Sequence, residues 1–224
     1  MKRLFAIGDV HGCYKTLYEL VFNRIRPEKT DRLIMLGDYI DRGRMSREVI
    51  DLIMNLKEEG YDIVPLTGNH ERMLLDSFDN PDNLPLWLMN DGQTTLESFG
   101  LDDISGLPEK YIDFFRSLNY FHREGNYLFV HAGFNDEAED PFSDRESMIW
   151  ESRFSYSNPV FANTRIIHGH RPKQLEYVRN MVSQNNQVIP IDTGCVYGSE
   201  MNRRYLSALE INTMEIISVE KMDE

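Results

Sequence analysis

The sequence has no long apolar run, little cysteine and little positive charge. None of its hydrophobic stretches approaches the roughly 20 residues that a membrane-spanning helix needs, so we expect no membrane association. The basic start at Lys2 and Arg3 reaches Gly8 too soon to leave room for the apolar core of a signal peptide. These two features favour a cytoplasmic protein.

The charge balance also excludes a class of partner. The chain has 24 basic against 37 acidic residues, which gives a formal net charge of −13. Nonspecific binding to DNA or RNA requires a basic face, so we expect no nucleic-acid partner. An acidic chain that binds a phosphate needs local cations, which metal ions or a few arginines can supply.

Cys13 and Cys195 are the only cysteines. They are too few and too far apart for a disulfide framework or a CxxC site. Free cysteine usually packs as a small apolar side chain, so we expect both to be buried.

The order of apolar segments predicts the fold class. The 224 residues suffice for one large domain, and no linker divides them, so we expect a single domain over residues 1–224. Short apolar runs bounded by glycine-containing turns are typical of buried strands. They occur at residues 4–7, 33–36, 63–66, 127–130, 165–167 and 188–191.

Helical periodicity fills two of the intervals between these strands. Residues 14–25 and 47–59 carry apolar side chains at helical spacing, with Ser46 as the expected N-cap and Gly60 as the expected stop of the second helix. Strands that alternate with helices predict an α/β fold.

Three other segments depart from this alternation. Residues 72–126 predict a helical insertion packed beside the sheet, and the acidic, turn-rich residues 134–163 predict a surface loop. Residues 205–219 return to apolar alternation, which predicts closing antiparallel strands.

Polar side chains follow the predicted strands. In such sheets ligands gather beyond the carboxyl ends of the strands, so these turns can converge. Taken singly, each residue has an ordinary structural explanation, but a fold gains nothing from several converging carboxylates and histidines without a cation. Carboxylate, imidazole and amide oxygen without thiolate suit Mn²⁺, Fe or Zn²⁺, and the set is large enough for two ions. Its members are Asp9, His11, Asp38, Asp41, Arg42, Asn69, His70, His131, His168 and His170.

Several of these segments resemble motifs of a known family, the PPP-type serine/threonine phosphoprotein phosphatases. The resemblance rests on GDVHG at 8–12, GDYIDRG at 37–43, GNHE at 68–71, VHAG at 130–133, HGH at 168–170 and IDTG at 191–194. It spans roughly residues 3 to 211 and is similar to the compact lambda-type branch of bacteria and phages. It implies a calcineurin-like metallophosphoesterase fold, a β-sandwich core flanked by helices.

The resemblance also implies a two-metal hydrolase. The ligands of the first metal would be Asp9, His11 and Asp38, and those of the second Asp38, Asn69, His131 and His170. A hydroxide that bridges the two ions would attack phosphorus directly. The ions implied are divalent, with Mn²⁺ first and Fe or Zn²⁺ also compatible.

By the same resemblance, His70 would be the general acid, and Asp41 would fix its tautomer and raise its pKa. Arg42 would bind phosphate oxygens. A second phosphate-binding arginine usually follows a Trp in this branch, which points to Arg153, although the spacing differs by one residue and Arg171 is a rival.

Two further motif residues keep simpler interpretations. Glu71 either caps the helix that follows it or orients a neighbour. His168 is expected to be structural or to contact the metal ligands without binding a metal itself.

Three functions follow as hypotheses. The first is a metal-dependent serine/threonine protein phosphatase, which acts on a phosphorylated protein or a small phosphoester. The second is a symmetrical bis(5'-nucleosyl)-tetraphosphatase; the IDTGC stretch that ends at Cys195 resembles that family too, whereas residues 169–172 favour the protein phosphatases. A noncatalytic phosphate-binding scaffold is disfavoured because no ligand or acid is missing. The native metal, the physiological substrate and the oligomeric state stay open.

Overall fold

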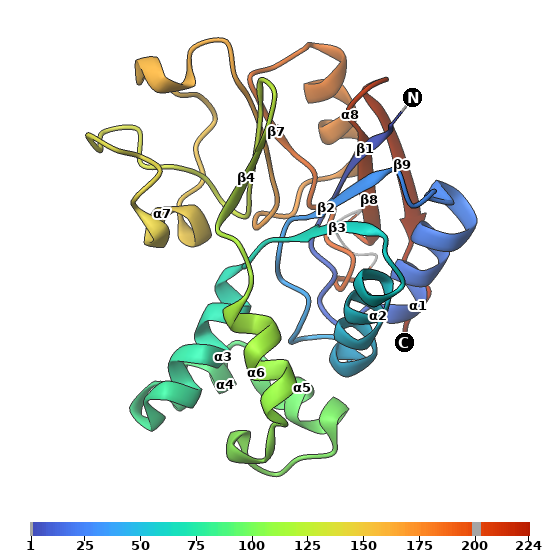
Figure 1. The fold of residues 1–224 in the computed structure, drawn as a ribbon, viewed down its shortest axis with the longest axis vertical. Helices are drawn as coiled ribbons and strands as arrows, with labels where there is room; N and C mark the ends of the chain where they lie inside the picture. The colour runs from blue at the N-terminus through green and yellow to red at the C-terminus, as the bar shows by residue number, and fades with distance from the viewer. Residues whose placement is uncertain (1, 199–202) are drawn as a thin grey trace.

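The computed structural model describes residues 2–198 and 203–224 (Figure 1). One sheet has the strand order β3-β2-β1-β8-β9. Its parallel strands are β1 (Leu4–Ile7), β2 (Arg32–Met35) and β3 (Asp62–Pro65), and β8 (Tyr205–Glu210) and β9 (Glu215–Glu220) close it in antiparallel pairing. The predicted closing strands are therefore confirmed.

The second sheet has the order β4-β5-β6-β7. Its strands are β4 (Phe121–Glu124), β5 (Tyr127–Val130), β6 (Arg165–His168) and β7 (Val188–Pro190). The strands β5, β6 and β7 are parallel, and β4 pairs antiparallel with β5. All six strands expected from apolar runs are present, with ends that differ by at most one residue.

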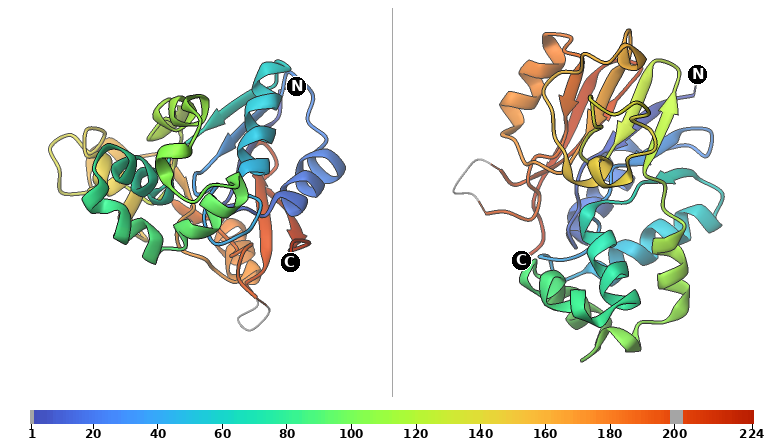
Figure 2. Two further views of the ribbon diagram at one scale, coloured as in Figure 1. Left: turned by 90° about the horizontal axis from the view of Figure 1, so that it is seen from below. Right: turned by 90° about the vertical axis from the view of Figure 1, so that its left-hand side faces the viewer.

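The two sheets pack face to face and form a β-sandwich (Figure 2). Ala6, Ile34, Phe129 and Ile167 are fully buried between them. Because successive side chains of a strand point to opposite faces, Phe5 packs on the other side of its sheet, against the helices. Continuous apolar strands are thus explained by burial on both faces.

Helices cover the outer face of the first sheet. The helix α1 (Tyr14–Tyr18) continues as the π-helix η1 (Glu19–Ile25), and α2 (Ser46–Glu58) follows β2. The expectation that Ser46 caps α2 is wrong, because Met45 occupies the cap position. The Ser46 hydroxyl instead accepts a hydrogen bond from Asp41 N at 3.2 Å. The helix α8 (Leu175–Ser183) packs beside β7.

The helical insertion lies at one end of the sandwich (Figures 1 and 2). It consists of α3 (Asn69–Asp79), η2 (Pro81–Asn83), α4 (Leu84–Met89), α5 (Gly92–Phe99), η3 (Ile104–Gly106) and α6 (Glu109–Arg116). Its expected extent to residue 126 is wrong, since β4 occupies Phe121–Glu124. That strand is only partly buried and carries no apolar run, so its pattern did not indicate a strand.

The segment 134–163 is only partly the surface loop that we expected. It contains α7 (Arg145–Trp150) and η4 (Pro159–Phe161). Phe134, Met148 and Phe161 are buried and pack with side chains of the second sheet. The sequence did not indicate that this segment contributes to the core, because its buried side chains are widely spaced and lie among acidic residues.

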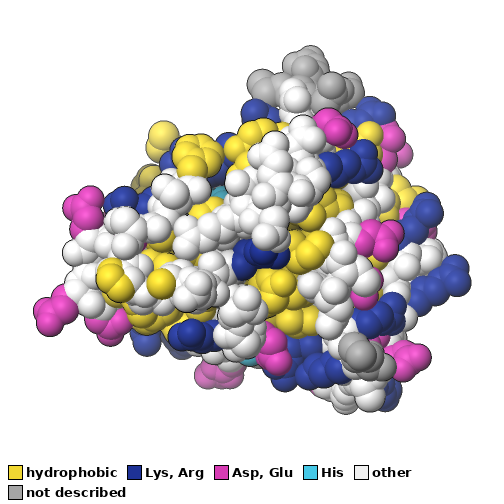
Figure 3. Space-filling model, turned by 90° about the horizontal axis from the view of Figure 1, so that it is seen from above, with side chains coloured by type: hydrophobic (Ala, Val, Ile, Leu, Met, Phe, Trp, Pro, Cys, Tyr) yellow, Lys and Arg dark blue, Asp and Glu magenta, His cyan; other side chains and the backbone are white. Residues whose placement is uncertain are grey.

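Charges on the described surface are mixed. Basic and acidic side chains are interspersed on the face seen from above in Figure 3. At the amino ends of the strands, Asp62 forms ion pairs with Lys2 at 2.9 Å and Arg32 at 3.0 Å. No helix in the described ranges has the length and apolar character required to cross a membrane.

Candidate metal centre

The site is built where the carboxyl ends of five parallel strands meet. The strands β1, β2, β3, β5 and β6 are followed by Asp9 and His11, Asp38, Asn69, His131, and His170, respectively. The turns are tight, and several non-glycine residues adopt a left-handed conformation with φ between 44° and 68°: His11, Asp38, Asp41, Arg42 and His170. Such backbone strain gathers at functional sites.

One half of the centre joins three side chains from three strands. His131 Nε2 lies 3.0 Å from Asn69 Oδ1 and 3.1 Å from His170 Nδ1, and the last two atoms are 3.0 Å apart. His131 Nδ1 donates to Leu36 O at 2.8 Å, which leaves the lone pair on Nε2. Three atoms that carry lone pairs therefore face one another.

Asp38 lies between this half and His11. Its Oδ2 is 3.4 Å from His11 Nε2 and 3.5 Å from His131 Nε2. His11 Nδ1 donates to Ile40 O at 2.9 Å, so its Nε2 carries the lone pair, which in this structure accepts a hydrogen bond from Arg42 Nη1. A carboxylate in this position could bind two cations at once.

Asp9 lies beside the backbone of His170. Its Oδ2 accepts a hydrogen bond from His170 N at 2.9 Å. Its buried Oδ1 has no hydrogen-bond partner within the described ranges. Buried carboxylate oxygens are normally paired, so this atom is a candidate ligand.

Two glycines permit the close approach of these loops. A Cβ on Gly68 would lie 2.1 Å from Asp38 Oδ1, and a Cβ on Gly169 would lie 2.0 Å from Asp9 Oδ1. Any side chain at either position would displace a carboxylate, which explains glycine beside the acidic residues.

The electrostatics favour the metal-binding forms of four of these side chains, whereas burial and the nearby carboxylates of Asp192 and Asp38 raise the pKa of Asp9. Burial lowers the pKa of His11 and His131, and burial together with His131 lowers the pKa of His170 to about 3. Burial alone would raise the pKa of Asp38, but the surrounding imidazoles, His131 foremost, outweigh it and lower the pKa. Neutral imidazoles and an ionised carboxylate are the forms that bind metal.

The donor set therefore fits a pair of divalent cations. Among the described residues, two groups of side chains lie close enough to hold an ion: His11, Asp38 and His70, and Asp38, His131 and His170. The first group contains His70 where the sequence predicted Asp9; both His70 Nε2 and Asp9 Oδ1 are buried without a hydrogen-bond partner in the described ranges, and Asp9 as a ligand stays a prediction. Carboxylate, imidazole and amide ligands without thiolate suit a hard or borderline divalent ion.

Beside the metal ligands, His70 and Asp41 form a buried pair. His70 Nδ1 donates to Asp41 Oδ2 at 2.7 Å. His70 Nε2 has no partner within the described part of the chain. Burial lowers the pKa of His70, but the carboxylates of Asp38 and Asp41 outweigh burial and raise it. The ring is thus held in one orientation with Nε2 free to donate a proton.

The insertion supplies the other partners of Asp41. Trp87 Nε1 in α4 donates to Asp41 Oδ2 at 2.9 Å, and Thr95 Oγ1 in α5 donates to Asp41 Oδ1 at 2.6 Å. A Cβ on Gly92 would lie 2.6 Å from the ring of Trp87, so glycine there lets the indole reach the carboxylate. The sequence pattern did not indicate Trp87 and Thr95, which are 46 and 54 residues away from Asp41 along the chain.

Glu71 combines both interpretations given to it. Its carboxylate accepts from Gly68 N, which caps α3, at 2.9 Å. It also accepts from Asp38 N at 2.9 Å and Tyr39 N at 2.7 Å. Burial and Asp38 raise the pKa of Glu71 to about 7. One side chain therefore joins the second and third motif loops.

The expected arginines differ in position. Arg42 Nη1 donates to His11 Nε2 at 2.7 Å, so its guanidinium lies at the edge of the centre. Arg153 pairs with Glu151 and, at 3.8 Å, with Glu137, and its role in phosphate binding stays a prediction. The side chain of Arg171 is exposed beside His170.

His168 lies behind the centre. It is buried at the end of β6, with Nδ1 3.0 Å from Gly169 O. Burial lowers its pKa to about 4. The side chain is in neither group that can hold an ion, which agrees with a supporting position.

Known proteins share this architecture and sequence pattern. The calcineurin-like phosphoesterase family matches residues 2–211. The serine/threonine-protein phosphatase 2 of Salmonella typhimurium is 28% identical over 86% of this chain and 88% of that protein. A symmetrical bis(5'-nucleosyl)-tetraphosphatase of Nitrosospira multiformis is 31% identical over 58% of this chain, which corresponds to 43% of that protein. A protein serine/threonine phosphatase structure from Saccharomyces cerevisiae superimposes with a TM-score of 0.69 over 100% of this chain and 81% of that one, at 15% identity.

Proposed function

This chain belongs to the calcineurin-like phosphoesterase family, and we propose that it is a metal-dependent serine/threonine phosphoprotein phosphatase. The family assignment makes it a hydrolase of phosphoesters. The observation that carries the finer proposal is the buried His70–Asp41 pair, 2.7 Å apart beside the metal centre.

The proposed ligands divide between two ions. Asp9, His11 and Asp38 would hold the first, and Asp38, Asn69, His131 and His170 would hold the second. We propose Mn²⁺, while Fe and Zn²⁺ suit the same ligands. When bound, two such ions acidify water at neutral pH and polarise the phosphoryl group.

The chain's own residues then act on the substrate. Arg42 binds phosphate oxygens through its planar guanidinium. His70 donates a proton from Nε2 to the departing oxygen, while Asp41 keeps the proton on Nδ1 and stabilises the charged ring. A seryl or threonyl alkoxide is a poor leaving group, so a held and protonated imidazole is most useful on these esters.

The sequence comparisons support both substrate classes, because an asymmetrical bis(5'-nucleosyl)-tetraphosphatase of Oceanobacillus iheyensis also matches over 97% of this chain and 92% of that protein, at 26% identity. The similarity to the Salmonella protein extends over most of both chains. The similarity to the symmetrical tetraphosphatase covers less than half of that protein.

A symmetrical bis(5'-nucleosyl)-tetraphosphatase is the second candidate, because that relative has the higher identity over the region matched. Its reaction breaks a phosphoanhydride bond, whose leaving group is already a stable phosphate. The same metal ligands would serve it, but the His70–Asp41 pair would contribute less.

A steady-state comparison tests the proposal. The purified protein is supplied with Mn²⁺, and kcat/KM is measured for a phosphothreonine peptide, a phosphotyrosine peptide, p-nitrophenyl phosphate and diadenosine tetraphosphate. We expect the phosphothreonine peptide to be the better substrate of the two physiological classes. Preference for diadenosine tetraphosphate would support the second candidate, and no turnover with any divalent ion would support a noncatalytic scaffold.

A further inference from the structure

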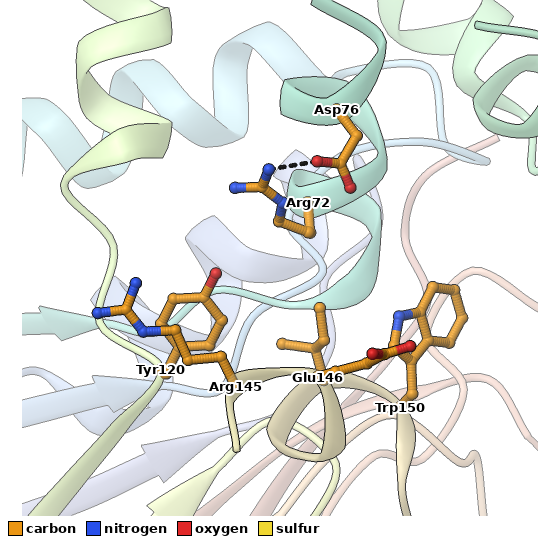
Figure 4. A pocket seen from close by; sticks show the side chains of 7 residues that line it. Arg72, Asp76, Tyr120, Arg145, Glu146 and Trp150 are labelled. Atoms are coloured by element: carbon orange, nitrogen blue, oxygen red, sulfur yellow. Dashed lines mark hydrogen bonds and ion pairs between the residues drawn. The ribbon is translucent and has the colours of Figure 1, made fainter. Parts of the chain in front are cut away.

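Two parts of the molecule border the metal centre without contributing a ligand. One is a cavity of about 340 Å³ between α3 and α7, where Arg72 and Arg145 approach from the two helices (Figure 4). The other is the segment 221–224, which lies beside α1, the helix that follows His11 (Figure 1). This segment forms specific hydrogen bonds with the start of that helix.

The start of α1 has no cap from its own neighbourhood. The N-cap residue is Cys13, whose side chain accepts no hydrogen bond from the helix. Serine, threonine, aspartate and asparagine suit this position best, because their side-chain oxygen accepts from the first free N–H groups. Lys15 N and Thr16 N are such groups. Because Thr16 is fully buried, a missing partner there would destabilise the helix start.

Asp223 supplies the cap from a distant part of the sequence. Its Oδ1 accepts from Lys15 N at 2.9 Å, and its Oδ2 accepts from Thr16 N at 3.0 Å and from Thr16 Oγ1 at 2.6 Å. The Thr16 hydroxyl in turn accepts from Met222 N at 2.9 Å. A carboxylate at a helix start also interacts favourably with the helix dipole. One side chain therefore satisfies both N–H groups.

The capped helix is continuous with the turn that carries His11. Cys13 N donates to Val10 O at 3.1 Å, and Leu17 N donates to Cys13 O at 3.0 Å. On the other side of the turn, His11 N donates to Asp38 O at 2.8 Å. His11 has a φ of 44°, which a residue other than glycine keeps only when its surroundings impose it. The position of α1 is thus one of the constraints that fix the His11 imidazole.

The same segment holds a second loop. Lys221 Nζ donates to Val196 O at 3.0 Å. Val196 follows Cys195, and Cys195 and Cys13 lie in one buried apolar cluster, which confirms the prediction that both cysteines are buried. Residues 221–224 therefore join the first motif loop to the loop that follows β7.

We propose that Asp223 is a positioning residue for the first metal ion: it caps α1 and so holds His11 where Nε2 can bind that ion. The inference rests on the metal centre of the proposed function. It goes beyond that function by assigning a role to a side chain outside every sequence motif of the site.

The contacts predict an effect on one ion. The hydrogen bonds of residues 221–224 go to α1 and to the loops around Val196 and Arg204. The ligands proposed for the second ion alone follow β3, β5 and β6, and in the described part of the chain the turns after these strands receive no such bond. Loss of the cap should therefore weaken the first ion more than the second.

Titration of the metal-free protein with Mn²⁺, with the free ion measured by electron paramagnetic resonance, tests the proposal. Asp223→Ala should weaken one of two binding steps by about tenfold, the lower end of the range for groups that support a metal ligand from outside. Asp223→Asn keeps one oxygen acceptor, so it should shift the same step less, and it carries the test if Asp223→Ala does not fold. Glu224→Ala removes the neighbouring exposed carboxylate and is the matched control, with both steps unchanged.

A double variant identifies the weakened step. His11→Asn should remove that step, and Asp223→Ala added to it should leave the remaining ion as tightly bound as in His11→Asn alone. Further weakening of the remaining ion, or equal weakening of both steps in Asp223→Ala, would show that Asp223 stabilises the fold as a whole and would overturn its positioning role.

Amide hydrogen exchange of the metal-free protein gives a readout that needs no ion. Asp223→Ala should raise exchange in residues 11–18 and leave residues 69–75 of α3 unchanged. A uniform rise in exchange, or none in residues 11–18, would contradict the proposal.

Turnover separates this inference from the proposed function. A protein that hydrolyses a phosphothreonine peptide, but whose Asp223→Ala variant binds both ions like the wild type, overturns the role of Asp223 alone. A protein whose first binding step responds as expected, but which hydrolyses no phosphopeptide, overturns the phosphoprotein phosphatase and leaves the role of Asp223 intact.

Discussion

The metal centre and the acid pair lie side by side but are built from different parts of the chain. Every proposed metal ligand lies shortly after a strand of the sandwich with a glycine close by, and Asn69 is the first residue of α3. Asp41 and His70 also follow strands, yet the groups that hold Asp41 come from α4 and α5 of the insertion. The strand ends thus form the part of the site that can hold metal, and the insertion determines how rigidly the acid is held.

This difference predicts two separable sets of defects. Changes at the strand ends should remove metal and stop the reaction with every substrate. Changes in the insertion should leave the metal bound and slow only those reactions whose leaving group needs a proton.

Asp38→Asn should have the largest effect. The change removes the charge that lies between the two halves of the centre, and hydrolysis of every phosphoester should fall by about a thousandfold or more. Metal analysis of the dialysed protein should give fewer than two Mn²⁺ per chain. Circular dichroism should match the wild type, and an intact activity would place the metals elsewhere.

His70→Asn should be next in size. Loss of a general acid should slow hydrolysis of a phosphothreonine peptide by about 10²–10⁴-fold, with a much smaller loss for p-nitrophenyl phosphate, whose phenolate leaves more easily. Both Mn²⁺ ions should remain. Equal slowing of the two substrates would argue against proton donation by His70.

Trp87→Phe removes the indole N–H that donates to both carboxylate oxygens of Asp41, and Thr95→Val removes the hydroxyl that donates to Asp41 Oδ1 and accepts from Asp41 N. Removal of such a supporting contact typically lowers activity by about 10–100-fold. We expect this decrease in kcat/KM for the phosphothreonine peptide but not for p-nitrophenyl phosphate. Thr95→Ser keeps the hydroxyl and is the matched control. Loss of Mn²⁺ from either variant would mean that the insertion supports the metal centre as well.

The pH profile gives a finer comparison. Although burial lowers the pKa of His70, Asp38 and Asp41 raise it, so the protonated acid persists to higher pH than an isolated histidine would allow. Activity on the phosphothreonine peptide should therefore be full below this pKa and fall as pH rises through it. Asp41→Asn removes one of the raising charges, so the fall should move to lower pH; an unchanged profile would assign this limb to another group.

The smallest expected effect concerns the two rival arginines. Arg153→Gln should raise KM for the phosphothreonine peptide by about tenfold, as for the loss of one charged hydrogen bond, while Arg171→Gln should have little effect. The reverse result would assign the second phosphate contact to Arg171.

Much of the centre could be predicted from the sequence because its residues are local to their strands. A buried strand requires an apolar run, and the turn that follows it carries the polar side chain, so Asp9 and Asn69 could be placed without long-range information. Glycine in the turns after the strands is a further local signal, since a Cβ on Gly68 or Gly169 would clash with the carboxylate of Asp38 or Asp9, respectively.

The side chains that hydrogen-bond to Asp41 could not be predicted in this way. Trp87 and Thr95 reach Asp41 only because the insertion folds back over the end of the sandwich, and their own helices are short and irregular. The strand β4 and the buried side chains Phe134 and Phe161 were missed for a related reason: their contacts are made across the chain, with no periodic pattern nearby.

The central claim is that turns from both sheets hold two cations against Asp38. Crystals grown with Mn²⁺ and measured at the manganese absorption edge test it directly. We predict two anomalous peaks about 3.5–4 Å apart, with Asp38 between them and Asp9 and Asn69 on opposite sides. A single peak, or peaks remote from these side chains, would contradict the account.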